Sequence, residues 1–593
     1  MRFMRNQESR CEFDSSVKTS APRRSPGGSG RPKGTRVTSF DRVRRATRAS
    51  RALAVALPLV GCAVPAVPTV PEHPERDVVA PRFVEETAAD GIDHRYDGEW
   101  EFFVGGGVAV FDCDADGRPD LYVAGGTEPA SLYRNRSAVG GALAFTRVED
   151  GATDLTLVTG AYPIDIDGDD VVDLAVLRRG ENVLLRGRGD CAFERANEAW
   201  GFDGGAGWTT AFSAKWEPGA TLPTLALGNY LVITDDRGAR PRCDESALFR
   251  PEADGGRYAQ ATPLTPGHCT LSILFTDWDR TGRRDLRVSN DRHYAIDGEE
   301  QLWRVEPGRA PRPWARDEGW RRLRIWGMGI ASQDIDGDGY PELYLTSMGD
   351  NKLRTLTDGP GQPSYGDTAL KRGVTAHRPF TGGELKSSTG WHAEFDDVNN
   401  DGRIDLFVAK GNVDAMPDFA SRDPNNLFLG RPDGSFEEAA ETAKVLDFAR
   451  SRGAAVSDLN LDGLLDLVVV ERREALRTWR NVGSGEGAGK PAPMGNWLAV
   501  ELAQDGPNAD AVGSWIEVRS AGRTIAREVT IGGGHAGGQL GPSHFGLGLA
   551  KDAGIRVHWP DGERSAWLDT RANRRVRIER GHGEPVTLEP PDG

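Results

Sequence analysis

Residues 334–347 read DIDGDGYPELYLTS, and the pattern in this stretch decides the fold. Its first nine residues carry acids at positions 1, 3, 5 and 9 and glycine at position 6. Five other segments repeat the pattern, with Asp, Asn or Thr at positions 1, 3 and 5 and Asp at position 9. They are DCDADGRPD (112–120), DIDGDDVVD (165–173), DWDRTGRRD (277–285), DVNNDGRID (397–405) and DLNLDGLLD (458–466). One pattern repeated along the chain indicates a repeat architecture.

The acidic segments predict metal loops. Several carboxylates converge on each loop, and their repulsion opposes folding unless a cation is bound. Ca²⁺ suits such irregular sets of oxygen ligands better than Mg²⁺ does. We therefore predict up to six structural Ca²⁺ ions. The predicted ligands are Asp112, Asp114, Asp116 and Asp120; Asp165, Asp167, Asp169 and Asp173; Asp277, Asp279, Thr281 and Asp285; Asp334, Asp336, Asp338 and Glu342; Asp397, Asn399, Asp401 and Asp405; and Asp458, Asn460, Asp462 and Asp466.

These loops differ from EF-hands, which need a bidentate Glu at position 12 and flanking helices. Position 12 here is Val or Leu, inside an apolar run such as LYLTS that is typical of a β-strand. Apolar runs also precede the loops, so the repeating unit is strand, loop, strand. The alternative is a set of solvated Asp-rich turns, but a turn needs only one or two acids.

The spacing of the loops reveals a further unit. They start at residues 112, 165, 277, 334, 397 and 458, so the second interval is about twice the others. Residues 207–230, GWTTAFSAKWEPGATLPTLALGNY, lie inside it and keep both strands, but Lys215, Glu217 and Pro218 replace the acidic run. We expect seven units, the third without an ion.

An aromatic residue begins a short strand near the end of most units, as in FEEAAE at Phe436. The seventh unit lacks this strand, whereas an unmatched copy, FVEETAADGI, begins at Phe83. A ring explains the split, because the N-terminal strand can complete the last sheet. The sequence therefore predicts an all-β fold, a seven-bladed β-propeller.

The units resemble FG-GAP/VCBS repeats, the type found in the integrin α-chain propeller. The segment from Asn496 resembles an ASPIC/UnbV domain in its pieces NWLAVEL, PNADAVGSWIEV, REVTIGGGHAGGQLGPSHFGLG and IRVHWPDGE. Together they resemble the cartilage acidic protein 1 family and its bacterial relatives. This resemblance implies an extracellular calcium-binding protein, usually without assigned chemistry. We interpret the glycine-rich run as tight β-turns in a small β-sandwich-like domain. Because that domain builds its own core, we expect it to tolerate removal well.

The predicted organisation has six parts. They are a leader with a lipoprotein signal peptide (1–61), a Pro-rich linker (62–81), the propeller (82–482), a flexible linker (483–495), the ASPIC/UnbV domain (496–582) and a tail (583–593).

The start of the chain predicts export. ALAVALPLVGC (52–62) is a short apolar run that follows several arginines, and LVGC matches a bacterial lipobox, so Cys62 would carry the lipid. An ordinary cleaved signal is the alternative. We expect an outer-membrane or cell-surface lipoprotein, otherwise a periplasmic or secreted protein.

Four cysteines remain besides Cys11 and Cys62. In an exported chain they suggest two disulfides. Cys243 with Cys269 is the favoured pair, since both fall in one long insertion between units. Cys113 with Cys191 follows by elimination, and free buried thiols are the alternative.

The sequence determines the function of the protein less closely than its fold. The net charge of −16 argues against nucleic acid as a partner. The chain holds no HExxH, GxSxG or P-loop motif, and we predict no catalytic residue. Trp208, Trp326, Trp391 and His392 precede loops and either line a ligand pocket at the channel mouth or pack between blades. We expect an adhesion or binding scaffold for protein or carbohydrate, which meets the membrane only through its lipid. The alternative is an enzyme with a substrate pocket at the channel mouth.

Overall fold

The structure is a computed structural model that describes residues 79–234, 240–253, 255–291, 298–379, 384–484 and 494–591. The predicted leader, Cys62, most of the Pro-rich linker and most of the second linker lie outside these residues. Within the described ranges, no helix has the length and apolar character needed to cross a membrane.

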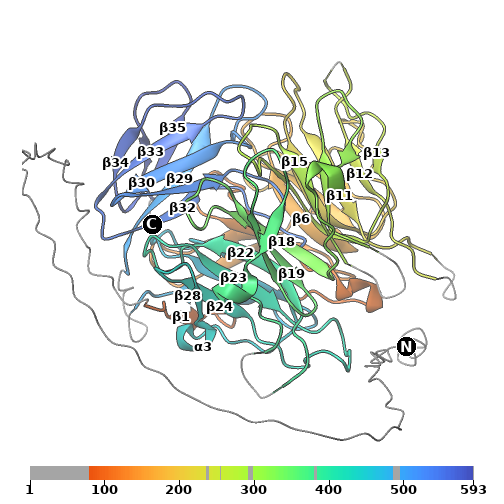
Figure 1. Cartoon of the computed structure of the whole chain (residues 1–593), viewed down its shortest axis with the longest axis horizontal. Coiled ribbons are helices and arrows are strands. Elements are labelled where there is room, and N and C mark those ends of the chain that lie inside the picture. Colours follow the sequence, from red (N-terminus) through yellow and green to blue (C-terminus); the bar gives the residue numbers. More distant parts are fainter. Residues whose placement is uncertain are drawn as a thin grey trace, which may run out of the picture. The chain divides into compact units, whose positions relative to one another are not determined.

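The repeats fold into four-stranded sheets arranged in a ring (Figure 1). Seven such sheets form between residues 83 and 481 of the described chain. Their inner strands β2, β6, β10, β14, β18, β22 and β26 contact one another in this order, and β26 contacts β2. The predicted all-β propeller class is therefore confirmed.

The strands of the sheets follow the chain from the inside outward. They are β2 (Val108–Phe111), β3 (Asp120–Val123), β4 (Ser131–Asn135) and β5 (Phe145–Val148); β6 (Val158–Ile164), β7 (Asp173–Arg178), β8 (Val183–Gly187) and β9 (Phe193–Arg195); β10 (Thr209–Lys215), β11 (Thr224–Asn229), β12 (Ser246–Phe249) and β13 (Thr262–Leu264); β14 (Thr270–Thr276), β15 (Asp285–Asn290), β16 (Gln301–Arg304) and β17 (Arg312–Pro313); β18 (Gly327–Gln333), β19 (Glu342–Ser347), β20 (Lys352–Leu356) and β21 (Tyr365–Asp367); β22 (Gly390–Asp396), β23 (Asp405–Lys410), β24 (Asn426–Gly430) and β25 (Phe436–Glu438); and β26 (Ser451–Ser457), β27 (Asp466–Glu471) and β28 (Arg477–Asn481). Short helices are η1 (Trp100–Phe103), η2 (Arg316–Glu318), α2 (Ala369–Arg372) and α3 (Ala440–Ala443).

The N-terminal strand closes the ring. β1 (Phe83–Glu85) pairs antiparallel with β28, with Phe83 opposite Asn481 and Glu85 opposite Trp479. The side chain of Phe83 is buried in the core between the last two sheets. The predicted closure is confirmed, because without β1 the backbone of β28 would be an open sheet edge.

Residues 496–588 form a separate pair of four-stranded sheets, drawn in blue in Figure 1. One sheet has the order β32-β29-β35-β36 and the other β31-β30-β33-β34. Leu498, Ile516, Phe545, Ile555 and Val576 are among the buried residues of their shared core, as in a β-sandwich. The strands are β29 (Asn496–Ala503), β30 (Trp515–Ser520), β31 (Arg523–Glu528), β32 (Ser543–Gly548), β33 (Asp552–His558), β34 (Leu568–Arg571), β35 (Arg574–Glu579) and β36 (Val586–Leu588).

The glycine-rich run of this domain corrects our interpretation of it as tight turns. Residues 531–540, IGGGHAGGQL, enter the centre of the propeller and make β-bridges to five inner strands; we call this segment the plug. The bridges join Ile531 to Ala214, Gly532 to Leu274, Gly534 to Ile330, Gly537 to Ala161 and Gln539 to Val110. The plug is therefore part of the propeller's interior, and the C-terminal domain is not a mere appendage.

Glycine makes this insertion possible, because backbone passes directly over backbone. A Cβ atom at either Gly107 or Gly160 would lie 1.8 Å from the carbonyl oxygen of Ala536, and one at Gly537 would lie 2.2 Å from that of Val108. Contacts this close exclude any side chain. The glycines of the plug and of the inner strands therefore fit each other.

Candidate metal sites

The six acidic loops share one internal scaffold. In each loop the backbone N–H at position 6 donates to the carboxylate at position 1, at 2.7–3.1 Å. Position 6 has a left-handed backbone, which suits glycine. In the second loop Asp170 holds it with φ 62°, a conformation that Asp tolerates better than most residues.

The acid at position 9 begins the strand after each loop and is buried. In five loops it accepts a hydrogen bond from the N–H at position 2, such as Cys113 to Asp120 at 2.8 Å or Ile335 to Glu342 at 3.1 Å. Burial raises the pKa of Asp120, Asp173 and Glu342 to about 8. A buried carboxylate of this kind needs a positive partner.

Three loops gather the acids of positions 1, 3 and 9. In each, one oxygen per residue lies within 4.8 Å of the others. The groups are Asp112, Asp114 and Asp120; Asp165, Asp167 and Asp173; and Asp334, Asp336 and Glu342. Asp114 Oδ1 and Asp167 Oδ1 are buried without a hydrogen-bond partner. Such orphaned anionic oxygens fit a hard cation, so the residues present suit the predicted ion.

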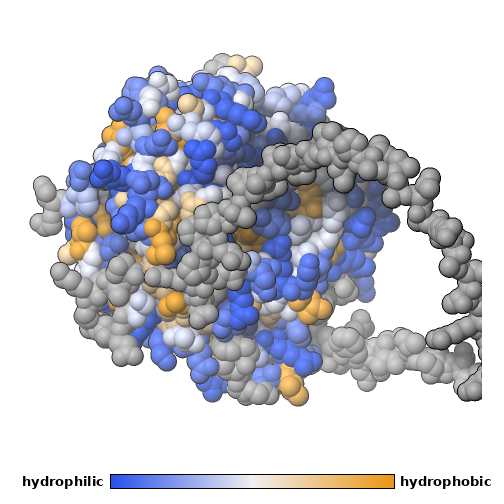
Figure 2. All heavy atoms as spheres, turned by 60° about the vertical axis from the view of Figure 1, so that its left-hand side comes forward, coloured by the Kyte–Doolittle hydropathy of each residue, from blue (hydrophilic) through white to orange (hydrophobic). Residues whose placement is uncertain are grey.

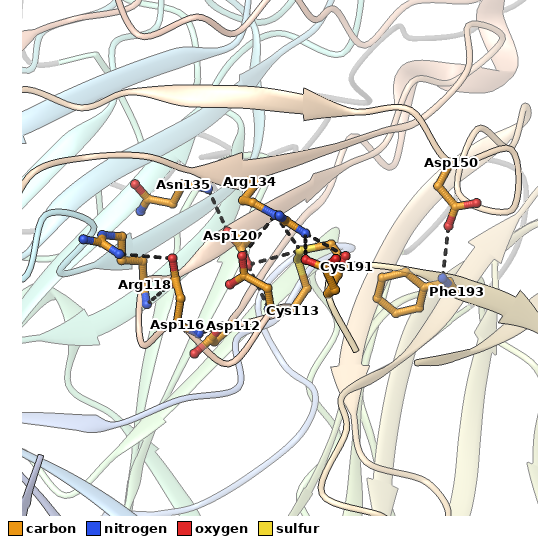
Figure 3. The surroundings of a disulfide bond; sticks show 12 residues. Asp112, Cys113, Asp116, Arg118, Asp120, Arg134, Asn135, Asp150, Cys191 and Phe193 are labelled. Atoms are coloured by element: carbon orange, nitrogen blue, oxygen red, sulfur yellow. Dashed lines mark hydrogen bonds and ion pairs between the residues drawn. A yellow bond between two sulfur atoms is a disulfide. The ribbon is translucent and has the colours of Figure 1, made fainter. Parts of the chain in front are cut away.

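The first loop is tied to the next blade (Figure 3). Cys113, at position 2, forms a disulfide with Cys191, and Cys243 is bonded to Cys269, so both predicted pairs are present. Arg134 Nε lies 3.0 Å from Asp114 Oδ2 and 3.3 Å from Cys191 Sγ. This arginine engages one oxygen of Asp114 and leaves Oδ1 for another cation.

The loops at 397–405 and 458–466 use an amide at position 3. Asn399 Oδ1 accepts a hydrogen bond from the N–H of Asp401 at 3.1 Å, and Asn460 does the same with Asp462 at 3.3 Å. Burial raises the pKa of Asp405 and Asp466 well above its ordinary value. These loops therefore keep the negative charge at positions 1, 5 and 9 and replace one carboxylate by a neutral oxygen ligand.

The loop at 277–285 differs, because its own arginine contacts the acids at both position 3 and position 9. Arg283 Nε lies 3.2 Å from Asp285 Oδ1, and its Nη2 lies 3.3 Å from Asp279 Oδ2. The indole N–H groups of Trp278 and Trp314 donate to Asp285 Oδ2 at 3.0 and 2.9 Å. The guanidinium and the two indoles together hold the acids at positions 3 and 9.

The third unit carries no acid at the ligand positions. Lys215 pairs with Thr224 in the register that pairs Ile164 with Asp173 one blade earlier. Thr224 therefore stands at position 9 and Trp216 at position 1, so Lys215 precedes the loop and does not replace its first acid as we expected. Its Nζ donates to the carbonyl oxygens of Arg284 and Val305.

We expect the stability of the metal-free protein to fall as the pH rises from 5 to 8. Burial raises the pKa of Asp120, Asp173 and Glu342 on folding to about 8. A group of this kind stabilises the fold while protonated, and that contribution is lost between its unfolded pKa of roughly 4 and its folded pKa. Ca²⁺ competes with protons for these oxygens, so its stabilising effect should grow over the same range. Thermal melts in chelator and in calcium at both pH values measure this; a metal-free melting temperature that rises with pH contradicts it.

The C-terminal domain contacts all six loops. Four contacts are polar: Arg575 Nη1 to Gly117 O at 2.6 Å, Arg280 Nη2 to Glu517 Oε1 at 3.1 Å, Asp277 N to Glu528 Oε1 at 2.9 Å, and Gly548 N to Asn400 O at 2.9 Å. Close packing joins Gly168 to Pro507, Gly337 to Thr524 and Gly463 to Trp497. Sequence reasoning missed these contacts, since the motifs of the C-terminal domain do not show which loops of the propeller they meet.

The four residues predicted to line a pocket do not share one site in the structure: the three tryptophans pack together, and His392 lies elsewhere. Trp208 and Trp391 are buried, and the partly buried Trp326 packs with them beside Phe103 and Tyr230. The rings of Trp208 and Tyr230 lie 5.2 Å apart, edge to face. These contacts favour packing over a ligand pocket for the tryptophans. His392 instead lines a cavity that is also lined by residues of the plug.

Comparisons with known proteins support this architecture. Residues 112–176 and 397–469 match the family described as FG-GAP-like repeat, and residues 504–585 match the one described as ASPIC and UnbV. No curated protein matches the chain. The chain therefore combines FG-GAP-like repeats with an ASPIC/UnbV domain.

Three solved structures illustrate the weak similarity by fold. A lectin of Agrocybe aegerita that recognises terminal N-acetylglucosamine is 14% identical, with 65% of this chain and 97% of the lectin covered and a TM-score of 0.34. Sqt1 of Saccharomyces cerevisiae is 11% identical, with 68% and 99% covered and a TM-score of 0.34. A mutant of AofleA from Arthrobotrys oligospora is 12% identical, with 57% and 87% covered and a TM-score of 0.31. Scores this low carry no conclusion about function, so the two sequence families are the informative matches.

Proposed function

We propose that the protein is an exported, calcium-stabilised binding scaffold akin to the cartilage acidic protein 1 family. The observation that carries the proposal is the pair of orphaned, buried oxygens on Asp114 and Asp167, each inside a cluster of three acids. Arg134 and Arg186 each engage the other oxygen of these two acids, and bound calcium would supply a positive partner for the orphaned ones. The ions stand in separate loops around a ring, an arrangement that suits a structural role and not one catalytic centre.

An ion count tests the proposal. Elemental analysis of the dialysed full chain should find five Ca²⁺ ions, because Arg283 substitutes for an ion in the loop at 277–285 and the third unit has no acids. Asp114→Asn should reduce the count to four, whereas Asp433→Asn, in an exposed turn where Asp433 bonds only Ser435, should leave it at five. A wild-type protein free of calcium after dialysis against calcium buffer contradicts the proposal.

The partner we propose is a protein or carbohydrate at the cell surface. FG-GAP-like repeats are typical of binding and adhesion scaffolds, and the match at 112–176 and 397–469 supports this class. The face drawn in Figure 2 is mostly hydrophilic, with small hydrophobic spots. A polar surface of this kind suits a hydrated partner better than an apolar one.

We further propose that Cys62 anchors the protein to a membrane by a lipid. Cys62→Ser should move the protein from the membrane fraction to the soluble fraction of a diderm bacterial host. Cys11→Ser, which alters a cysteine outside the lipobox, is the control and should leave the distribution unchanged. Retention of the Cys62→Ser variant in the membrane fraction would show that another anchor acts.

A further inference from the structure

A cavity of about 280 Å³ lies between the inner strands of the propeller and the C-terminal domain. Val110, Ile330 and Val456 give it an apolar wall from three blades, and the plug contributes Gln539 and Leu540. Asp112 and Asp458 of two acidic loops also line this space, but most of its lining residues lie outside the loops. The polar groups that line the cavity therefore determine which ligand it can bind.

The most unusual of these groups stand on β22, which reads GWHAEFD. His392, Glu394 and Asp396 occupy alternate positions and therefore project from the same face of the strand. Glu394 is the single glutamate in the seven inner strands. All three side chains line the cavity.

Hydrogen bonds fix the carboxylate of Glu394. The backbone N–H of Val456 donates to Oε2 at 3.1 Å, and the amide of Gln539 donates to Oε1. His392 Nδ1 accepts the N–H of His535 at 3.1 Å, so the ring proton resides on Nε2, which lies 3.4 Å from Glu394 Oε2. Three donors leave the carboxylate with acceptor capacity to spare.

The basic side chain at ion-pair distance from Glu394 is His392, whose Nε2 lies 3.4 Å from Oε2 and which carries a positive charge only when protonated. The nearby Asp396 is paired, with Arg527 Nη1 at 2.9 Å from its Oδ2. Glu528 also lines the cavity, as do Arg527 and Arg575, of which Arg527 is the partner of Asp396. Burial accordingly raises the pKa of Glu394. A partly buried carboxylate without a permanently charged partner is costly, so this place favours a cation.

A hard metal ion does not fit there. Such an ion needs several oxygen ligands, whereas the neighbours of Glu394 are the N–H groups of Gln539, His392 and Val456. An alkylammonium group needs few acceptors, and its carbon chain suits the apolar wall. We propose that this cavity binds a small aliphatic amine whose ammonium group pairs with Glu394. Glu394 is not among the predicted metal ligands, so the proposal goes beyond the scaffold function.

Calorimetric titration of the full chain in saturating calcium tests it, with 1,4-diaminobutane as the probe and 1,4-butanediol as its uncharged counterpart. We expect one saturable site for the diamine and no binding of the diol. Saturating calcium keeps the diamine from the acidic loops. Equal binding of diamine and diol, or no binding of either, overturns the proposal without any variant.

Two variants locate the site. Glu394→Gln keeps the shape and removes the charge, so it should weaken diamine binding at least about tenfold. Glu471→Gln is the matched control, because Glu471 is a buried acid of the seventh blade that bonds Ser451 and does not line the cavity. Unchanged affinity in Glu394→Gln, or an equal loss in Glu471→Gln, overturns the assignment to this cavity.

Discussion

Chelation of divalent cations is expected to lower the melting temperature of the full chain by more than about 10 °C. An ion that binds only the folded state adds about 2.7 kcal/mol at a hundredfold excess over its Kd. Five sites of this strength contribute on the order of 13 kcal/mol, and about 1 kcal/mol shifts the melting temperature of a large domain by roughly 2 °C. Calorimetric melts with and without chelator measure the effect.

Readdition of Ca²⁺ should restore the melting temperature, which separates loss of metal from irreversible damage. Asp167→Asn should remove a single site and cause only a fraction of the shift. Glu217→Gln, in the acid-poor third unit, alters a residue outside the predicted ligand positions and should not change the size of the chelator effect. A melting curve that is identical in chelator and in calcium would disprove structural calcium.

Removal of residues 494–593 is expected to destabilise the propeller severely, contrary to the tolerance that the separate core of this domain suggests. The deletion withdraws the plug from the channel and exposes Val110, Leu274 and Ile330, which it now covers. It also removes the contacts made to all six loops. We expect aggregation, or a melting temperature lower by at least as much as chelation produces, in melts and light scattering of the truncated chain.

A point variant isolates the plug from the rest of the domain. Gly537→Ala places a Cβ atom 2.2 Å from the carbonyl oxygen of Val108 and should cost about 3 kcal/mol through overpacking. Gly541→Ala is the matched control, because a Cβ atom there meets nothing within 4 Å. If both variants melt alike and the truncated propeller stays soluble and stable, the plug is not an integral part of the ring.

Local periodicity explains why the ring could be predicted from the sequence. An acidic loop followed by LYLTS or LVVVE specifies a strand without reference to the rest of the chain, and the unmatched strand at Phe83 requires a closing partner. The two disulfides could be predicted because only four cysteines remain once Cys11 and Cys62 are set aside. The strand register of the third unit could not be predicted, since a one-residue shift such as that of Lys215 depends on how the strands pair.

The sequence by itself therefore determined the repeat, the propeller class, the acidic ligand sets and the closing strand, because each is encoded in neighbouring residues. Tertiary structure alone decided that Arg283 fills one loop, that the glycine run plugs the channel and that Glu394 faces a cavity. These features join residues far apart in the chain: Ala536 meets Gly160, and Gln539 meets Glu394. Such contacts depend on how distant segments of the chain approach each other in space, and no local pattern of residues specifies that approach.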